Sequence, residues 1–199
     1  MNKDIEARGM ALDALATPPR EALFATPIDY LAADHDRQRV LCWTLDRIAR
    51  SEAPDAEEIR AVLRFLAEDF AVHVTDEEED LFPLLARRAE PEDRIGDVLA
   101  ELSAEHAAEK PEALAVARGL EAALATGSLD DALRPVLTRF AAAERRHLIV
   151  ENAIVLPLAR ARLTGDDLRT MTLRMTARRG VAVGGREVGG DRRAFSMPA

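Results

Sequence analysis

The sequence predicts an all-α protein. We expect an up-down antiparallel four-helix bundle over residues 26–163, a short extra C-terminal helix over residues 164–180 and a flexible tail. Of the 199 residues, 48% are hydrophobic but only 4% are aromatic, and alanine, leucine, arginine and glutamate dominate, which is typical of helices rather than sheets. Apolar residues also recur at steps of three and four along four long stretches. A chain of this length can form one domain with a proper core.

Residues 1–25 are expected to form an N-terminal arm, either a short helix or a loosely docked segment, because Pro18-Pro19 interrupts any helix there. The first bundle helix should begin with Thr26 as N-cap and Pro27 at the first helical position, and run to about Arg50. Its buried side is expected to carry Leu31, His35, Gln38 or Arg39, Cys42, Trp43 and Leu45.

The second bundle helix should begin near Asp55, after a turn that contains proline. Pro83 falls inside the expected helix, so we expect it to kink the helix or end a segment of it, and we expect the same of Pro157 further along the chain. Positions at helical spacing on the second helix are Ile59, Leu63, Leu66, Phe70, His73 and Glu77.

The third helix should run from about Ile95 towards Leu124, with a bend at Pro111, and end at Gly127, where a left-handed C-cap favours glycine. The fourth covers about Leu129–Arg162. Its inward positions are Leu133, Val136, Leu137, Phe140, His147 and Glu151.

The C-terminal region divides into two parts. An amphipathic helix within residues 164–180 places Leu168, Met171 and Met175 on one face. Five of the ten glycines fall in the last twenty residues, and apolar periodicity disappears there. Residues 181–199 are therefore expected to be a flexible tail.

Two stretches of the chain repeat one pattern. In each, a glutamate follows a histidine by four residues and a proline follows that histidine by ten: His73, Glu77 and Pro83 in one, and His147, Glu151 and Pro157 in the other. Residues four apart lie on one face of a helix, so each pair can aim an imidazole nitrogen and a carboxylate at one point. Only four histidines occur in the chain, which makes two copies of this spacing hard to attribute to chance.

Each of the four long helices carries one histidine on its apolar stripe. In a bundle these stripes converge, and bundle cores are a known place for metal sites. Buried carboxylates without a metal would need other partners or would have to protonate. The alternative to a metal site is that these histidines are ordinary core residues that bind no metal. The candidate metal ligands are His35, His73, Glu77, His106, His147 and Glu151. Four imidazoles and two carboxylates supply about eight donor atoms, which is too many for one ion. Two six-coordinate ions would accept about twelve donors, so positions would remain for an exogenous molecule.

These motifs resemble the hemerythrin-like, or HHE cation-binding, domain family, from about Pro27 to Gly180. The resemblance rests on His35, His73-x-x-x-Glu77 with Leu81-Phe82-Pro83, Glu105-His106, His147-x-x-x-Glu151 with Leu156-Pro157, and the closing Met175–Gly180. It implies a bundle that holds two iron ions bridged by an oxo or hydroxo group and by the carboxylates of Glu77 and Glu151, with the histidines as terminal ligands. Ligand type alone leaves manganese and zinc open.

The sequence departs from the oxygen-carrying members. They have a second histidine four residues after that of helix three, where this chain has Lys110, and no fifth histidine exists here. A further carboxylate, Glu109 or Asp80, would complete the ligand set, although both are more often solvated helix charges. The rest of the run Glu78–Asp80 is expected to be a solvated face. Cys42 is expected to be a small buried core residue; a redox-sensing thiol is the alternative.

The resemblance implies a protein that binds or senses oxygen, peroxide, nitric oxide or iron. There are three alternatives: an oxidase or peroxidase, an iron-sulfur repair factor, and an iron-storage or iron-sensing module that signals through its C-terminal region to a protein partner. Whether the protein turns over a substrate, and its oligomeric state, are left open. The net charge of −9 argues against nucleic acid as a partner. The chain lacks an apolar run for a membrane span or a secretory signal, and its single cysteine allows no disulfide within the chain, so we expect a cytoplasmic protein.

Overall fold

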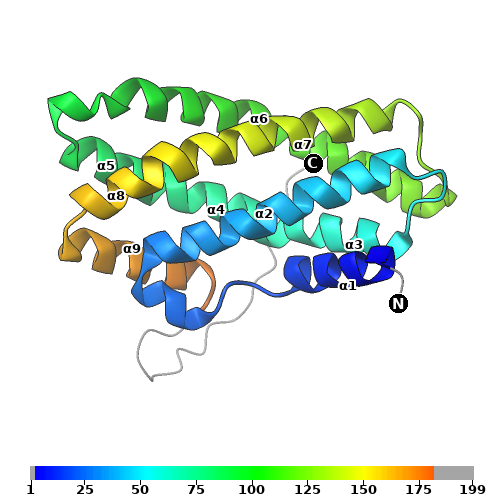
Figure 1. Cartoon of the computed structure of the whole chain (residues 1–199), viewed down its shortest axis with the longest axis horizontal. Helices are drawn as coiled ribbons and strands as arrows, with labels where there is room; N and C mark the ends of the chain where they lie inside the picture. The colour runs from blue at the N-terminus through cyan, green and yellow to red at the C-terminus, as the bar shows by residue number, and fades with distance from the viewer. Residues whose placement is uncertain (1–2, 182–199) are drawn as a thin grey trace.

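Four long helical segments run alternately up and down in the computed structural model, which describes residues 3–181 (Figure 1). No strand occurs in that range, so the predicted all-α bundle is confirmed. The first segment is α2 (Pro27–Arg50); the second is α3 (Ala56–Phe65), η2 (Leu66–Phe70), α4 (Ala71–Asp76), η3 (Glu77–Leu81) and α5 (Phe82–Arg88); the third is α6 (Ile95–Thr126); the fourth is α7 (Leu133–Val150), η5 (Glu151–Val155) and α8 (Leu156–Arg162). The expected tail lies outside the described residues.

The helix ends follow local capping chemistry. Asp55 is the N-cap of α3, and its side chain accepts a hydrogen bond from the backbone N–H of Glu57 at 2.7 Å. Gly127 ends α6 with a φ of 73°, the left-handed conformation that glycine adopts without strain. Thr26 does stand at the N-cap of α2, ahead of Pro27, but its side chain makes no capping hydrogen bond.

The two repeated prolines do not end their helices. A π-helical segment precedes each one, η3 before Pro83 and η5 before Pro157. In both, the N–H of the residue before the proline donates to the carbonyl of the glutamate five residues earlier. Proline has no N–H and its ring crowds the carbonyl four residues back, so the wider turn keeps the helix continuous. Helix α6 likewise runs through Pro111.

Two further elements pack against the bundle (Figure 1). Helix α1 (Lys3–Ala16) buries Leu15 in the core, and its Arg8 pairs with Asp55 at 2.8 Å. Helix α9 (Gly165–Arg178) buries Met171 and Met175, as its apolar periodicity predicts. The short 3-10 turns η1 (Glu21–Ala25) and η4 (Pro91–Asp93) complete the described part of the chain.

The buried apolar side chains form two clusters with polar residues between them. One cluster includes Leu45, Phe70 and Phe140, and the other includes Leu81, Leu102 and Met175. Trp43 does not extend the first cluster as predicted, because 36% of its surface is exposed, whereas Leu45 is fully buried. The region between the clusters contains all four histidines of the chain, each buried. The fold therefore places its unusual polar residues midway along the bundle.

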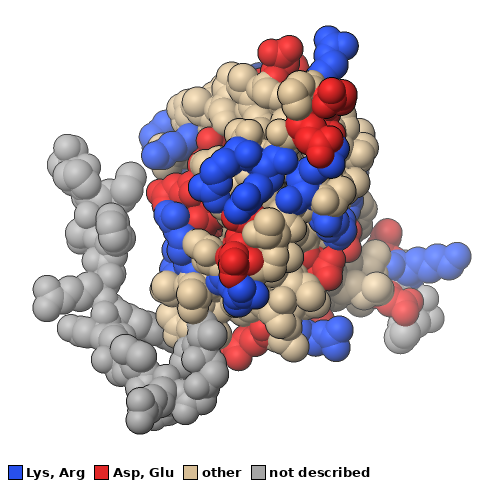
Figure 2. All heavy atoms as spheres, turned by 90° about the vertical axis from the view of Figure 1, so that its left-hand side faces the viewer, with Lys and Arg blue, Asp and Glu red and all other residues tan. Residues whose placement is uncertain are grey.

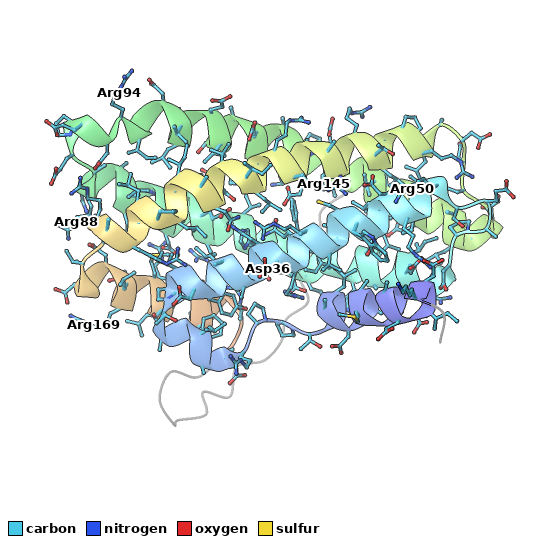
Figure 3. The ribbon with its side chains drawn as sticks, in the orientation of Figure 1. Asp36, Arg50, Arg88, Arg94, Arg145 and Arg169 are labelled. Carbon is cyan, nitrogen blue, oxygen red and sulfur yellow. The ribbon has the colours of Figure 1, made fainter. Side chains whose placement is uncertain are left out.

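Acidic and basic side chains are interspersed on the end face that Figure 2 shows. Arg162 of α8 pairs there with Asp93 at 2.8 Å and with Glu90 at 3.0 Å. At the same end, Arg88 of α5 donates from Nε to Asp167 of α9 at 2.8 Å, and Figure 3 labels its position. These pairs connect the start of α6 with α8, and α5 with α9. None of the helices within residues 3–181 is long and apolar enough to cross a membrane.

Candidate metal centre

The structure brings all six predicted residues together at the middle of the bundle. They form two groups of four, and within each group one candidate ligand atom per residue lies within 4.8 Å of the others. One group is His35, His73, Glu77 and Glu151; the other is Glu77, His106, His147 and Glu151. All six side chains are buried, with at most 6% of any residue exposed. Both groups share the same two glutamates.

The first group surrounds the Nε2 atoms of His35 and His73, which lie 3.1 Å apart. Oε1 of Glu77 lies 3.3 Å from Nε2 of His35 and 3.2 Å from Nε2 of His73. Oε2 of Glu151 lies 3.4 Å from Nε2 of His35. Each of the two glutamates therefore directs one oxygen at this pair of histidines.

The remaining glutamate oxygens face the second pair of histidines. Oε2 of Glu77 lies 3.5 Å from Nε2 of His106, and Oε1 of Glu151 lies 3.1 Å from Nε2 of His147. Each carboxylate thus has one oxygen on either side. This is the arrangement that allows a carboxylate to bridge two metal ions, with two imidazoles at each end.

Several of these atoms are close to one another without being hydrogen-bonded. Oε2 of Glu77, Nε2 of His147 and both carboxylate oxygens of Glu151 are buried and have no hydrogen-bond partner. Buried polar groups are normally satisfied, so such atoms require an explanation. Ligand atoms that converge on a common point, rather than on each other, have this geometry. The residues therefore fit a centre that holds metal ions.

Three of the histidines are oriented by carboxylates that the sequence analysis did not identify. Nδ1 of His73 lies 3.0 Å from Asp34, Nδ1 of His106 lies 2.6 Å from Glu78, and Nδ1 of His147 lies 2.8 Å from Glu105. A carboxylate accepts from the Nδ1–H, so Nε2 is the ring nitrogen that faces the centre. Each carboxylate is adjacent in sequence to a predicted ligand but serves a histidine on another helix, which sequence spacing alone does not indicate.

The fourth histidine, His35, has a different partner. Nδ2 of Asn152 lies 2.9 Å from Nδ1 of His35 and donates to the carbonyl oxygen of Leu148 at 2.6 Å. A carbonyl only accepts, so the amide N–H groups face both neighbours. An amide that donates to Nδ1 favours the tautomer with the proton on Nε2. His35 must therefore move this proton before it can bind a metal through Nε2.

The electrostatics of the centre favour protonation of two histidines, His147 and His73, when no metal is bound. Burial opposes the charge on His147, but the neighbouring Glu151 outweighs it and raises the pKa of His147 to about 10. The same balance, with Glu77 and Asp34 as partners, raises the pKa of His73. Burial also works against ionised Glu77, yet His73 and His35 hold its pKa well below the usual range. Metal ions must displace protons from this centre.

Glu77 is the first residue of the π-helical segment η3, and Glu151 is the first residue of η5. Side chains of α9 bind residues in and next to η3. Asp76 and Asp80 flank Glu77 and are almost fully buried. Arg178 donates to Asp76 at 2.8 Å and also to Asp80, and Arg179 approaches Asp76 at 2.6 Å. π-Helical segments are frequent at functional sites. Here one of them links Glu77 to the C-terminal helix.

The other predicted site candidates lie outside the two groups. Asp80 is buried, pairs with Arg174 and Arg178 of α9 and belongs to neither group, so it is not a solvated charge. Glu78 is not part of a solvated face either, because it holds His106 and accepts from Ser103 at 2.9 Å. Cys42 is fully buried among apolar residues, and its pKa is raised by that burial. Glu109 is buried but belongs to neither group.

Comparison with known proteins agrees with this geometry. A family model, the Hemerythrin HHE cation binding domain, matches residues 26–159. No curated protein and no solved structure matches the chain. The matched range contains all six residues of the two groups and covers more than half of the chain. The chain belongs to the hemerythrin HHE cation-binding family.

Proposed function

We propose that this protein is a non-haem di-iron protein that binds or senses oxygen, peroxide, nitric oxide or iron. One observation carries the proposal: the two buried groups of ligand atoms share both Glu77 and Glu151. Two ions next to each other repel, and carboxylates between them offset that repulsion. One isolated ion would not need two such groups.

The donor set is compatible with iron and leaves coordination positions unfilled. Imidazole and carboxylate suit iron, and they suit manganese and zinc as well. Four imidazoles and two shared carboxylates supply about eight donor atoms, while two six-coordinate ions accept about twelve. The unfilled positions are available to a small molecule. Iron would supply one-electron redox chemistry there.

The surrounding residues prepare the centre for this role. Asp34, Glu78 and Glu105 keep a proton on Nδ1 of their histidines, so three Nε2 atoms can bind without a change of tautomer once any proton on Nε2 is lost. Burial excludes bulk water, which strengthens the attraction between the ions and the carboxylates. His35 is the exception, because Asn152 orients it differently. The two ends of the centre are therefore not equivalent.

A sensing role is favoured by the contacts of α9. Its Arg178 and Arg179 bind Asp76, which is adjacent to Glu77 in the chain. A change in the position of Glu77 on metal binding or release would alter these ion pairs. We infer that the occupancy of the centre is transmitted to the C-terminal region, where a protein partner would detect it.

The test is the reactivity of the iron-loaded protein. Protein loaded with Fe²⁺ under anaerobic conditions is mixed separately with air, peroxide and nitric oxide, and the near-ultraviolet and visible absorption is recorded. We expect new ligand-to-iron absorption bands with at least one of the three, and none in a His73→Ala/Glu151→Ala variant. An unchanged spectrum with all three reagents contradicts the proposal. Continuous consumption of peroxide would instead favour the oxidase or peroxidase alternative.

A further inference from the structure

A second set of buried polar side chains lies about one helical turn from the histidines, on the side of Phe70 and Phe140. It consists of Gln38 of α2, Glu109 of α6 and Glu144 of α7, with exposed fractions of 2%, 6% and 1%. Each is three residues away from one of the predicted ligands, towards the same end of the bundle. Glu109 was considered above as an additional ligand of the centre but belongs to neither group, and Gln38 and Glu144 have no role in the proposed centre.

The helix register places the two carboxylates at one level. Helices α6 and α7 are antiparallel (Figure 1), and Glu105 of α6 contacts His147 of α7 at 2.8 Å. Four residues further along α6 is Glu109, and three residues back along α7 is Glu144, so the two lie at about the same level on neighbouring helices. Their charges interact, since the charge on Glu109 raises the pKa of Glu144.

Gln38 is on α2, the helix that packs against α7. It lies on the inward stripe of α2 between His35 and Cys42. His35 lies 3.4 Å from Glu151, and the pKa of the Cys42 thiol is raised by burial and by the charge of Glu144. Helix α2 packs closely along α7. Gln38 therefore lies between the level of the predicted ligands and that of Glu144.

One polar atom of each side chain in this set lacks a partner. Nε2 of Gln38, Oε2 of Glu109 and Oε1 of Glu144 are buried and make no hydrogen bond. No Lys or Arg within residues 3–181 pairs with either carboxylate. Burial raises the pKa of both carboxyls, that of Glu144 to about 8. Unpaired buried carboxylates are costly, so a positive partner would stabilise the fold.

We propose that Glu109, Glu144 and Gln38 form a third cation position, next to the His/Glu centre, for a hard divalent ion such as Mn²⁺ or Fe²⁺. Two carboxylates and the oxygen of a turned amide supply only oxygen donors, which hard cations prefer, while imidazole-rich sites favour zinc. The position goes beyond the proposed di-iron function. The competing explanation is that the carboxylates only balance the charge of two ions in the centre, in which case no third ion binds.

The test separates the two kinds of site by metal preference. The full chain is first loaded with about two equivalents of Zn²⁺ and freed of unbound metal, so that the His/Glu centre takes up the zinc, which Mn²⁺ does not displace from nitrogen-rich sites. It is then titrated with Mn²⁺, and free Mn²⁺ is measured by electron paramagnetic resonance. The variant is Glu109→Gln/Glu144→Gln, which keeps the side-chain shapes. The control is Glu112→Gln on α6, because Glu112 is partly exposed and faces Arg139 at 3.6 Å.

We expect wild type and Glu112→Gln to bind about one Mn²⁺ per chain, and the double variant to bind none. The proposal is overturned if zinc-loaded wild type binds no Mn²⁺, or if the double variant binds as much as wild type. Thermal unfolding of the double variant checks that it folds. Each single variant is expected to weaken Mn²⁺ binding at least about tenfold. Zinc content, measured on the same samples, reports separately on the His/Glu centre.

Discussion

Replacement of Glu105 by alanine tests how the centre is oriented. Glu105 lies 2.8 Å from Nδ1 of His147, and its side chain makes no other hydrogen bond or ion pair within residues 3–181. Its side chain is 43% exposed, and His147 keeps its ion pair with Glu151 at 3.1 Å, so the removal of Glu105 should lower the free energy of unfolding by only about 1 kcal/mol. The substitution therefore acts on the orientation and basicity of His147.

The expected effect is on metal affinity. Loss of a carboxylate that orients a metal-binding histidine typically weakens binding about 10–100-fold, which corresponds to about 1.4–2.7 kcal/mol. Only the group of His106, His147 and the two glutamates contains His147, so we expect weakening of one of two ions. Competition between the protein and a coloured chelator for Zn²⁺ measures both affinities.

A matched control is Glu101→Ala. Glu101 lies one turn earlier on α6, is exposed, and has no hydrogen bond or ion pair with the described residues. Its removal should leave both affinities within about twofold of wild type. If Glu105→Ala also binds both ions as wild type does, the orienting role assigned to these carboxylates is wrong.

Three more predictions concern pH, backbone and α9. The metal-free protein should lose stability as pH rises through about 10, the raised pKa of His147, because the stability that this shift contributes is fully present only below about 6.5, the ordinary pKa of histidine. Metal binding at pH 8 should release at least about one proton, which calorimetry in buffers of different ionisation heat would measure. If no proton is released, the assigned charge state of His147 is wrong. Gly127→Ala should destabilise by about 1 kcal/mol, since its φ is 73°, while Gly96→Ala, with nothing near its added Cβ, should stabilise by about 0.5–1 kcal/mol in urea unfolding; equal effects would contradict the assigned backbone. Arg178→Ala should cost about 1–3 kcal/mol, because Asp76 and Asp80 each keep only one arginine, and should remove any metal-dependent change in hydrogen exchange of α9. The exposed pair Arg160–Asp29 gives the control Arg160→Ala, expected to cost less than about 1 kcal/mol, and equal costs would argue against the role of α9.

The bundle and the six central residues could be predicted from sequence because both follow helical spacing. Residues such as His73 and Glu77 are four apart, and that spacing alone places them on one face. Apolar periodicity located α9 and its buried Met171 and Met175 for the same reason. Local rules of this kind need no knowledge of the neighbouring helices.

The partners that complete the site depend on contacts between helices. Asn152 meets His35 across 117 positions of sequence, and Glu105 meets His147 across 42. Such pairs become visible only once the register of the helices is known. Glu144 was missed although it lies on an apolar stripe, because a single glutamate on a helix is usually solvated. The π-helical segments were also missed, since proline indicates a local disturbance without specifying how the helix absorbs it.

The number of metal ions per chain tests the central claim most directly. Metal-free protein is titrated with Fe²⁺ under anaerobic conditions, and bound iron is counted after removal of the free ion. With the proposed third position removed by Glu109→Gln/Glu144→Gln, we expect about two ions per chain, about one when His106→Ala is added and none bound tightly when Glu77→Ala is added, because His106 belongs to one group and Glu77 to both. No iron in wild type, or equal losses in the two variants, would contradict a centre in which two ions share the same carboxylates.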